Sequence, residues 1–476
     1  MKLDQLAHAV GCTGVMSDME ITGLCTDSRR AKAGDLFFCY RGQKFDSHSC
    51  VVQLKEAGVA ALVCERKLDC DLPQIVVADG RAAVAKAARI FYGEADRVLK
   101  LVAVTGTNGK TTTTYMLDSI FRAAGKKCGI IGTLGITYGG RFIAPELTTP
   151  DPVYLHSVLR DMADCGVEYV FMEVSAHALY FDKVAGLKFE AGIFTNCTQD
   201  HLDFFQDMSS YAVCKKKLFE RGRCRRSVIN IDDAVGREIA RFAPSPMTYG
   251  LNNPADVFAV DVEESIEGVK FILNLCDELY EVELHVPAVH NAYNAMAAAT
   301  CAKLLGVNIE TIAKGLAALR SVPGRLERVG CFNGAHIFVD FAHTPDGLEK
   351  SLSSLKKLCR GRLYCLFGCG GNRDKTKRPL MGAVAAKYAD FCIITSDNPR
   401  YEDPYDIIRE IEDGVRPSGK SYVTVTDRET ATEYALNLLK EGDVLLVAGK
   451  GGENYQEIMG IKHSYNDNTV IKNIIG

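Results

Sequence analysis

Runs of mostly apolar residues, separated by amphipathic stretches, recur along the chain. The runs predict buried strands, and apolar residues spaced three or four positions apart predict helices. After Gly324 the two patterns alternate regularly, as is typical of a parallel sheet with helices on both faces. The pattern therefore predicts an α/β protein. The predicted strands are Asp35–Cys39, Val59–Val63, Gln74–Val77, Leu101–Val104, Tyr169–Met172, Ala191–Phe194, Ile337–Val339, Leu363–Phe367, Phe391–Ile394 and Val444–Val447.

Changes in this pattern divide the chain into three segments. Residues 1–97 hold short strands between amphipathic stretches, as in a small α/β module. Residues 98–321 begin a second α/β segment with a glycine-rich turn, and residues 322–476 form a third that starts at Val322-Pro323-Gly324. A chain of 476 residues is long enough for three domains, at roughly 100–200 residues per domain. We find no internal repeat or low-complexity linker.

The glycine-rich turn reads TGTNGKTTTTY and lies between a predicted strand and a predicted helix. Backbone N–H groups at such a helix N-terminus attract phosphates. Lys110 is suited to reach the outer phosphates of a nucleotide triphosphate, and the Thr111 hydroxyl is suited to ligate Mg²⁺. Val104 replaces the first glycine of the usual pattern, which argues against most motor and switch NTPases. The predicted nucleotide-binding residues are Gly106, Thr107, Asn108, Gly109, Lys110, Thr111 and Thr112.

The composition narrows the choice of partners. The chain is 47% hydrophobic and 24% charged, with a net charge of −4, and so lacks the basic excess of a nucleic-acid binder. It opens without a positively charged leader, and no apolar run is long enough to cross a membrane. The 18 cysteines are scattered without C-x-x-C pairs, as expected for thiols in a reducing compartment. We expect a cytoplasmic monomer that binds neither nucleic acid nor membranes.

Polar clusters follow several predicted strands, where open α/β sheets bind their ligands. Glu173 ends one strand, and Asp200 and His201 follow the next, a combination able to hold a divalent cation. In the third segment, GCGGNRDKTKRP contributes Arg373, and DNPR contributes Arg400. Because the planar fork of arginine suits carboxylates, these two loops predict an anionic or zwitterionic substrate.

Taken in order, the motifs resemble the Mur ligase family over nearly the whole chain. The family's fold is three-domain: an N-terminal UDP-sugar-binding domain, a central P-loop ATPase domain and a C-terminal Rossmann-like domain for the incoming amino acid. The resemblance therefore implies an ATP-dependent amide ligase that uses Mg²⁺. The matching motifs include TDSRR, GTNGKTT, LTTPDP, MEVSAHAL, TNCTQDHLD, YAVCKKKLF, HNAYNAMAA, VPGRLERV, VDFAHTPDGLEKSL, TSDNPRYEDP and AGKGGENYQ.

The resemblance also implies roles for single residues. Glu173 and His201 match Mg²⁺ ligands, and Lys215 matches a lysine that is carbamylated in relatives. For ATP it implies adenine contacts by Asn291 and Asn294, a phosphate contact by Arg325 and a ribose contact by Asp340. For the UDP-linked substrate it implies Ser28 at the uridine, with Thr148, Thr149, Ser175 and Lys183. For the amino acid it implies Arg373, Asp397, Asn398, Pro399, Arg400, Gly449 and Glu453.

Five residues depart from the pattern of the relatives, among them Gly452, which replaces a common histidine. Lys183 replaces an arginine and Phe181 a polar residue, while Ala288 replaces a glycine and Phe341 a tyrosine. The changes at Lys183 and Phe181 lie in the part of the chain that the resemblance assigns to the UDP-linked substrate.

The resemblance is to the branch of the family that adds the third residue of the peptidoglycan stem peptide. In this branch ATP activates the D-glutamate carboxylate of UDP-MurNAc-L-Ala-D-Glu as an acyl phosphate, which the amine of meso-diaminopimelate then attacks. Arg373, Arg400 and Glu453 favour meso-diaminopimelate over L-lysine, because its far end carries a second carboxylate and ammonium. Alternatives are an L-lysine-adding relative, a ligase like folylpolyglutamate synthetase, and a nucleotide-dependent switch.

Overall fold

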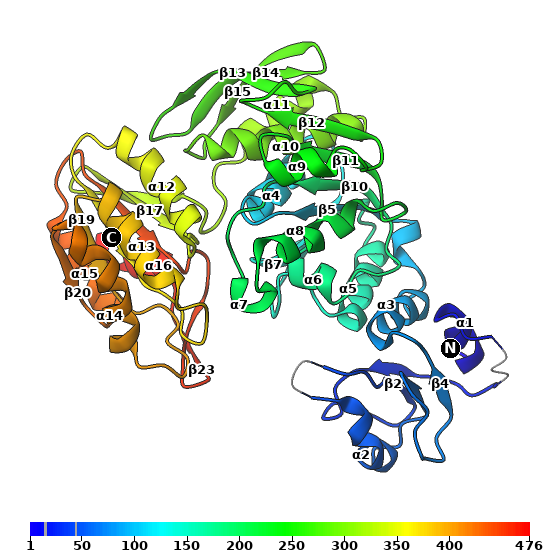
Figure 1. Ribbon diagram of the computed structural model, residues 1–476. Coiled ribbons are helices and arrows are strands. Elements are labelled where there is room, and N and C mark those ends of the chain that lie inside the picture. Colours follow the sequence, from blue (N-terminus) through cyan, green and yellow to red (C-terminus); the bar gives the residue numbers. More distant parts are fainter. Residues whose placement is uncertain (14–16, 43–44) are drawn as a thin grey trace. The chain divides into compact units, whose positions relative to one another are not determined.

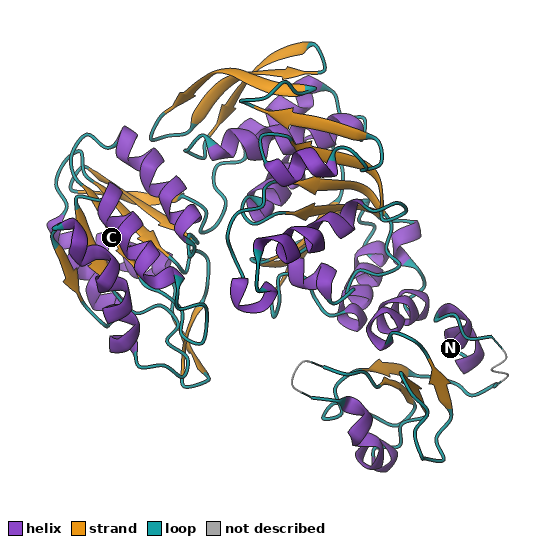
Figure 2. Ribbon diagram, viewed as in Figure 1, coloured by secondary structure: helices purple, strands orange, loops and turns teal. Residues whose placement is uncertain are grey.

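The computed structural model describes residues 1–13, 17–42 and 45–476. They form two compact units, each built from three stretches of chain. Figures 1 and 2 show the helices and strands of these residues. The first consists of Met1–Ala103, Lys126–Gly192 and Cys214–Arg225, and the second of Val104–Gly125, Ile193–Val213 and Arg226–Gly476. The segments 1–97, 98–321 and 322–476 follow changes of sequence pattern and stay a prediction.

The N-terminal part of the first unit is a four-stranded parallel sheet in the order β1-β2-β3-β4. Alternate residues of β2 face opposite sides, with Leu36 and Phe38 in one core and Phe37 in the other. The predicted strands up to Val77 are confirmed to within two residues. The elements are α1 (Leu3–Ala9), β1 (Gly23–Cys25), β2 (Asp35–Phe38), η1 (Ser47–Cys50), α2 (Val51–Glu56), β3 (Ala61–Cys64), β4 (Gln74–Val76), α3 (Gly80–Phe91) and η2 (Ala95–Arg97).

An 11-stranded sheet has the order β15-β14-β13-β12-β11-β10-β5-β9-β6-β7-β8. Its strands are β5 (Lys100–Thr105), β6 (Cys128–Gly132), β7 (Gly135–Tyr138), β8 (Arg141–Ile143), β9 (Tyr169–Glu173), β10 (Phe189–Phe194), β11 (Cys224–Asn230), β12 (Pro246–Gly250), β13 (Val257–Glu264), β14 (Val269–Leu275) and β15 (Glu278–Leu284). Both ends of the sheet are antiparallel, β6-β7-β8 at one end and β13-β14-β15 at the other. The sequence pattern did not predict these end strands.

Helices between these strands include two that begin directly at sequence motifs. Helix α4 (Lys110–Ala123) starts at the glycine-rich turn, and α10 (His290–Leu304) starts at HNAYNAMAA. The others are α5 (Pro152–Asp164), α6 (Ala176–Tyr180), α7 (Leu202–Phe205), α8 (Met208–Lys216), η3 (Lys217–Phe219), α9 (Ala234–Ile239) and α11 (Ile309–Ala318). No helix in the described part of the chain is both long and apolar enough to cross a membrane.

The C-terminal part is a six-stranded sheet covered by helices on both faces, as the sequence pattern predicts. Its order is β16-β17-β21-β18-β19-β20, and only β16 is antiparallel. Helices α12 (Pro345–Leu358), α13 (Lys377–Tyr388) and α14 (Pro404–Val415) share one core, while α15 (Arg428–Leu438) and α16 (Asp467–Ile475) pack on the other face. The strands are β16 (Glu327–Phe332), β17 (Ala335–Asp340), β18 (Leu363–Phe367), β19 (Phe391–Ile394), β20 (Tyr422–Thr424) and β21 (Val444–Ala448), with η4 (Arg416–Ser418) and a hairpin of β22 (Tyr455–Ile458) and β23 (Ile461–Ser464).

Candidate active site

The glycine-rich turn joins β5 to α4, as predicted. Gly106 has a φ of 152° and Gly109 a φ of 88°, a backbone region that favours glycine. A Cβ atom on Gly106 would lie 1.9 Å from Thr195 Oγ1, and one on Gly109 would lie 2.3 Å from Asn294 Oδ1. Both glycines are therefore required for the turn to pack against β10 and α10.

Residues that follow β10 fix the shape of the turn. Asn196 accepts a hydrogen bond from the Asn108 N–H at 2.9 Å and donates one to the Asn108 carbonyl at 3.1 Å. The Thr107 hydroxyl donates to the Thr198 carbonyl at 3.1 Å and accepts from the Thr198 N–H at 3.0 Å. Because these bonds link two strand ends, the fold itself holds the turn in this shape.

Three predicted phosphate-binding side chains meet at this turn. The Lys110 ammonium donates to two carbonyl oxygens of the turn, each at 2.9 Å. Arg325 Nη2 donates to Thr111 Oγ1 at 3.0 Å. The guanidinium of Arg325 also lies 4.5 Å from the centre of the Phe341 ring. The structure therefore places a second cation beside the helix N-terminus, stacked on the phenylalanine that replaces the family's tyrosine.

Asp200 lies in the same positively charged surroundings. Burial alone would raise the pKa of its carboxyl, but the charges of His201, His343, Lys377 and Lys110 lower it below its usual value. His201 Nε2 lies 3.3 Å from Asp200 Oδ2, and its backbone has a φ of 56°. A strained backbone of this kind is often found at functional sites. Asp200 is thus an anion among several cations beside the turn.

The residues predicted to contact adenine and ribose are buried and bonded within the protein. Asn294 donates to Asn291 Oδ1 at 2.9 Å, and Asn291 donates to a backbone carbonyl at 2.6 Å. The carboxylate of Asp340 accepts the N–H groups of Leu326 and Ala342 at 2.5 and 2.8 Å, and burial raises its pKa. Asp340 therefore orders the backbone next to Arg325, and its ribose contact stays a prediction.

Ala288 stands just before these asparagines, where relatives have glycine. Its φ is 79°, in the left-handed region that favours glycine. Its carbonyl accepts the Asn291 N–H at 2.9 Å in the first turn of α10. A residue with a side chain is therefore strained at this position, and glycine would fit the backbone without that strain.

The four predicted metal ligands are divided between the two units. Thr111 and His201 belong to the second unit, and Glu173 and Lys215 to the first. Among the residues that the structure describes, no three His, Cys, Asp or Glu side chains form a metal-binding group. Lys215 lies in the last turn of α8 and is only 1% exposed, which is an unusual environment for a lysine.

Glu173, at the end of β9, is held in one orientation. Its carboxylate accepts bonds from the Thr133 N–H at 2.9 Å and the Thr133 hydroxyl at 3.0 Å. A Cβ on Gly132 would lie 2.2 Å from Glu173 Oε1, so the carboxylate rests directly on the backbone of β6. The side chain is 1% exposed. A buried, oriented carboxylate of this kind is well suited to a cation.

Predicted contacts to the UDP-linked substrate surround the same strand end. The Thr149 hydroxyl donates to the Glu173 carbonyl at 2.8 Å and accepts the Ser175 N–H at 3.1 Å. Thr148 and Thr133 share a hydrogen bond of 3.1 Å between their hydroxyls. The structure therefore brings Thr148, Thr149 and Ser175 together with Glu173.

A pocket of about 350 Å³ opens elsewhere in the first unit. Its lining includes Thr26, Tyr40, Arg81, Asp151, Phe181 and Lys183. The Lys183 ammonium lies 2.8 Å from Asp151 Oδ1. Of the predicted substrate-binding residues only Lys183 lines the pocket, whereas Ser28 lies two positions beyond the lining residue Thr26.

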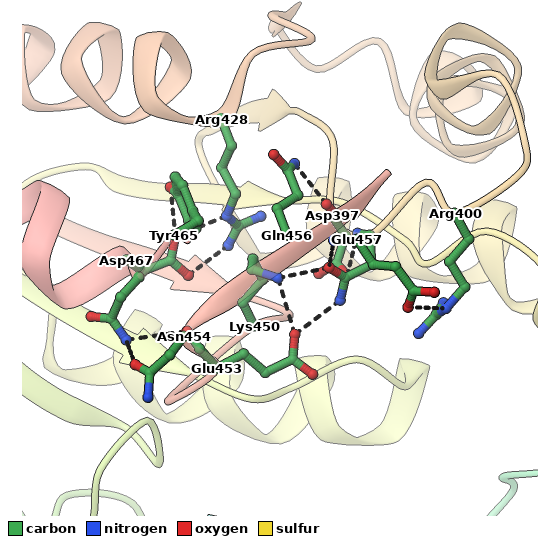
Figure 3. Close-up of polar contacts among 12 residues, drawn as sticks. Asp397, Arg400, Arg428, Lys450, Glu453, Asn454, Gln456, Glu457, Tyr465 and Asp467 are labelled. Carbon is green, nitrogen blue, oxygen red and sulfur yellow. Dashed lines mark hydrogen bonds and ion pairs between the residues drawn. The ribbon is translucent and has the colours of Figure 1, made fainter. Parts of the chain in front are cut away.

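A second polar site lies after β19 and β21 (Figure 3). Asn398 Nδ2 donates to Glu453 Oε2 at 2.9 Å, and the ammonium of Lys450 donates to both Asn398 Oδ1 and Glu453 Oε2, at 3.1 and 3.0 Å. A Cβ on Gly449 would lie 2.8 Å from Asp397 Oδ2, so Asp397 approaches the backbone there. The two predicted amino-acid-binding loops are thus brought together, with Lys450 as the link that the sequence analysis missed.

Arg400 is clamped by the hairpin β22–β23. Its N–H donates to the Glu457 carbonyl at 3.0 Å and its Nε to Glu457 Oε2 at 3.2 Å, while Nη1 donates to the Gly371 carbonyl at 2.8 Å. Its φ is 53°, another left-handed residue at a candidate site. A Cβ on Gly370 would lie 2.9 Å from Arg400 Nη1 and 3.8 Å from Arg373 Cγ, so the two arginines flank Gly370.

A buried ion pair supports the strand end that leads into this site. Arg428 Nε and Nη2 donate to the two Asp467 oxygens at 2.8 and 2.9 Å, and Nη2 also donates to the Ala448 carbonyl at 2.9 Å (Figure 3). Because Ala448 ends β21, this pair fixes the strand end from which Gly449 and Lys450 project.

Comparison with known proteins identifies the family. Three family models match: "Mur ligase family, catalytic domain" at residues 20–99, "Mur ligase middle domain" at 104–302 and "Mur ligase, glutamate ligase domain" at 324–451. A UDP-N-acetylmuramoyl-L-alanyl-D-glutamate--2,6-diaminopimelate ligase of Geobacillus thermodenitrificans is 41% identical over 461 residues, which are 95% of this chain and 94% of the relative. The chain belongs to the Mur ligase family.

Solved structures agree with this assignment. A UDP-N-acetylmuramoyl-L-alanyl-D-glutamate--2,6-diaminopimelate ligase matches this Mur ligase with a TM-score of 0.72 and 31% identity, covering 100% of this chain and 99% of the other. A folylpolyglutamate synthase of Mycobacterium tuberculosis, complexed with ADP, has a TM-score of 0.65 and 18% identity over 77% of this chain and 91% of its own. The second likeness concerns the fold alone.

Proposed function

We propose that this Mur ligase joins meso-diaminopimelate to the D-glutamate of UDP-MurNAc-L-Ala-D-Glu in peptidoglycan precursor synthesis, at the expense of ATP. The observation that carries this proposal is the presence in one chain of a rigid glycine-rich turn at a helix N-terminus and of a polar cluster formed by two loops. The name of the relative that is 41% identical over 95% of the chain supports the same activity. We further propose that the enzyme acts as a cytoplasmic monomer on these small molecules.

The reaction requires no nucleophile from the protein. The D-glutamate side-chain carboxylate attacks the γ-phosphate of ATP, which gives an acyl phosphate and releases ADP. The amine of the amino acid then attacks the acyl carbon, and phosphate leaves as the amide forms. Lys110, Arg325 and the N-terminus of α4 are suited to neutralise the charge that develops on the phosphoryl oxygens. The remaining task of the protein is to hold the reacting groups in line.

We propose that Thr111, Glu173, His201 and a carbamylated Lys215 hold Mg²⁺ for this reaction. The donor chemistry fits, because Mg²⁺ prefers oxygen ligands and Glu173 offers a carboxylate already oriented by Thr133. When bound, the ion supplies positive charge to the phosphoryl oxygens. Carbamylation would convert the buried amine of Lys215 into another oxygen donor.

The choice of amino acid rests on charge. Both candidates carry an L-centre, but only meso-diaminopimelate has a carboxylate at its far end. Arg400 and Arg373 supply guanidinium groups for that carboxylate, and Glu453 supplies an acceptor for the ammonium beside it. L-Lysine would place an ammonium against these arginines, which we expect the site to disfavour.

The decisive experiment is a competition between the two amino acids. Purified enzyme, ATP, Mg²⁺ and UDP-MurNAc-L-Ala-D-Glu are incubated with meso-diaminopimelate and L-lysine at equal concentration, and the products are separated by mass. We expect diaminopimelate to predominate and Lys110→Ala to form neither product. Predominant lysine incorporation would overturn the choice of amino acid, and ADP release independent of both substrates would contradict the ligase itself.

A further inference from the structure

The pocket of the first unit contains an arginine that none of the arguments above uses. Arg81 is the second residue of α3, and its guanidinium lies 4.4 Å from the centre of the Phe181 ring and 5.5 Å from the centre of the Tyr40 ring. Its Nη2 donates to the Arg41 carbonyl at 3.1 Å. Within the described residues no carboxylate lies at ion-pair distance from this guanidinium. The positively charged guanidinium of Arg81 is therefore contacted by two aromatic rings and by one uncharged carbonyl oxygen.

The start of α3 is built to hold Arg81 at this place. A Cβ on Gly80 would lie 2.7 Å from Tyr40 Cβ and 3.1 Å from the Cys39 carbonyl, so only glycine lets the helix approach the end of β2 this closely. The Asp79 side chain accepts the Arg81 and Ala82 N–H groups at 2.9 and 3.0 Å, which caps the helix. Arg81 therefore leaves a rigid helix start directly into the pocket.

The charges that line the pocket favour an anionic ligand. Arg81 and Lys183 are its two cations, and Asp151, which pairs with Lys183, is its one carboxylate among the lining residues described. The Asp151 side chain is 63% exposed, so its charge is largely screened by solvent. The N–H groups of a guanidinium stacked on a ring point outward in the guanidinium's own plane, roughly parallel to the ring, where they are able to form paired hydrogen bonds with phosphate oxygens. The volume of about 350 Å³ is within the range of small-molecule sites.

We propose that Arg81 binds the diphosphate of the UDP-linked substrate, with Phe181 and Tyr40 holding its guanidinium flat. This inference rests on the proposed function, because that function supplies a diphosphate ligand. It also gives Phe181 a purpose: the ring that replaces a polar residue of the relatives becomes the platform for an arginine from another element. Lys183 lacks the planar guanidinium of the arginine that it replaces. In this chain Arg81 supplies a guanidinium to the same pocket.

Binding of nucleotide fragments separates a diphosphate contact from a structural one. UDP and uridine are titrated calorimetrically into the wild-type chain, Arg81→Gln, Arg81→Lys and Phe181→Leu. We expect Arg81→Gln to weaken UDP binding about 10- to 100-fold and to leave uridine binding unchanged. Arg81→Lys keeps the positive charge but lacks the planar guanidinium, and Phe181→Leu keeps the guanidinium but lacks the aromatic ring against which it packs. We therefore expect both variants to lose less UDP affinity than Arg81→Gln. Arg97→Gln removes a surface arginine that pairs with Glu94 and serves as the matched control.

Steady-state kinetics supply the second readout. We expect Arg81→Gln to raise the KM for UDP-MurNAc-L-Ala-D-Glu about 10- to 100-fold while the KM values for ATP and the amino acid stay unchanged. Equal losses of UDP and uridine affinity, or an unchanged UDP affinity, would show that Arg81 only packs α3 and would overturn the inference. Arg81-dependent UDP binding by a protein without ligase turnover would remove the proposed function and leave this site standing. Normal ligase turnover, together with a UDP affinity that is the same in wild type and Arg81→Gln, would overturn this inference and leave the proposed function standing.

Discussion

Asn108 and Asp346 lie 238 residues apart in the sequence, yet Asn108 Nδ2 donates to Asp346 Oδ2 at 2.8 Å. The same oxygen accepts bonds from Thr198 Oγ1 at 3.1 Å and from Lys350 Nζ at 2.8 Å. Asp346 lies in the first turn of α12, where a negative charge is favourable. One carboxylate oxygen thus joins the phosphate turn, the loop after β10 and the C-terminal segment.

This convergence predicts that Asp346→Ala impairs use of ATP. The change leaves Asn108 and Lys350 without their shared acceptor, and the turn loses a constraint on its geometry. We expect kcat/KM for ATP to fall about 10- to 100-fold, with the far-ultraviolet circular dichroism spectrum unchanged. Asp413→Ala, which removes an exposed carboxylate of α14, is the matched control. Wild-type ATP kinetics in Asp346→Ala would show that the bond has no part in nucleotide binding.

Ten of the strands could be predicted because buried parallel strands are often continuous apolar runs, whereas other parallel strands, such as β11 and β12, were missed. Residues 363–367 and 391–394 were predicted with the bounds that β18 and β19 have. The antiparallel strands β13, β14 and β15 escaped prediction because they are partly exposed and polar residues interrupt the run, whereas β6 and β7 are mostly buried but short and contain glycine. In β14, VKFILNL, buried residues alternate with more exposed ones. A search for period-two alternation would have found it.

The sequence could predict only those parts of the site whose position follows from the ends of the strands. Loops after parallel strands meet at one edge of a sheet, so the predicted residues Asn398 and Glu453 do lie together. Lys450 could not be assigned a role, because its two bonds depend on how each loop folds. Arg400 adopts a left-handed backbone that no sequence rule indicates. Arg81 escaped notice because its aromatic partners come from separate parts of the chain.

The burial of His156 leads us to predict that the folded protein loses stability in acid. It lies on α5 and is 1% exposed, and burial, with a contribution from Arg89, lowers its pKa to about 4. Between pH 6.5 and pH 4 the unfolded chain therefore binds a proton that the folded chain does not, and the free energy of unfolding falls as pH decreases by about 1.4 kcal/mol per pH unit. His156→Leu removes this dependence. Urea unfolding at about pH 7 and pH 5 should show the variant gaining about 2 kcal/mol relative to wild type at the lower pH; parallel curves would contradict the prediction.

From the proposed role of Lys215 in holding Mg²⁺, we predict that its replacement abolishes activity. If its buried amine is carbamylated, Lys215→Ala removes an oxygen donor to Mg²⁺, and we expect turnover to fall nearly to background. Acetate or formate at high concentration should restore part of the rate by filling the vacated position. Lys188→Ala, at an exposed lysine of the same unit, is the control. Isotope-labelled bicarbonate should give a carbamate signal in the wild type that Lys215→Ala lacks, and an absent signal in active wild-type enzyme would rule the carbamate out.

We predict that Arg400 is a main source of the preference for meso-diaminopimelate over L-lysine. Glu457 and the Gly371 carbonyl hold its Nε and Nη1, so the guanidinium is oriented before the amino acid binds. We expect Arg400→Ala to raise the KM for meso-diaminopimelate about 10- to 100-fold, because the far carboxylate loses a charged partner. The rate with L-lysine should rise slightly, since lysine has no carboxylate to lose there and Arg400→Ala removes a cation that faces its ammonium.

The ratio of kcat/KM for the two amino acids is the measurement that distinguishes selection from general damage. A collapse of this ratio in Arg400→Ala, with a smaller change in Arg400→Lys, would show that the planar fork reads the far carboxylate. Arg409→Ala, at an exposed arginine of α14, should leave the ratio unchanged. A parallel loss with both amino acids would instead mean that Arg400 holds the loop that carries Asn398, and discrimination would then have to come from Arg373 and Glu453.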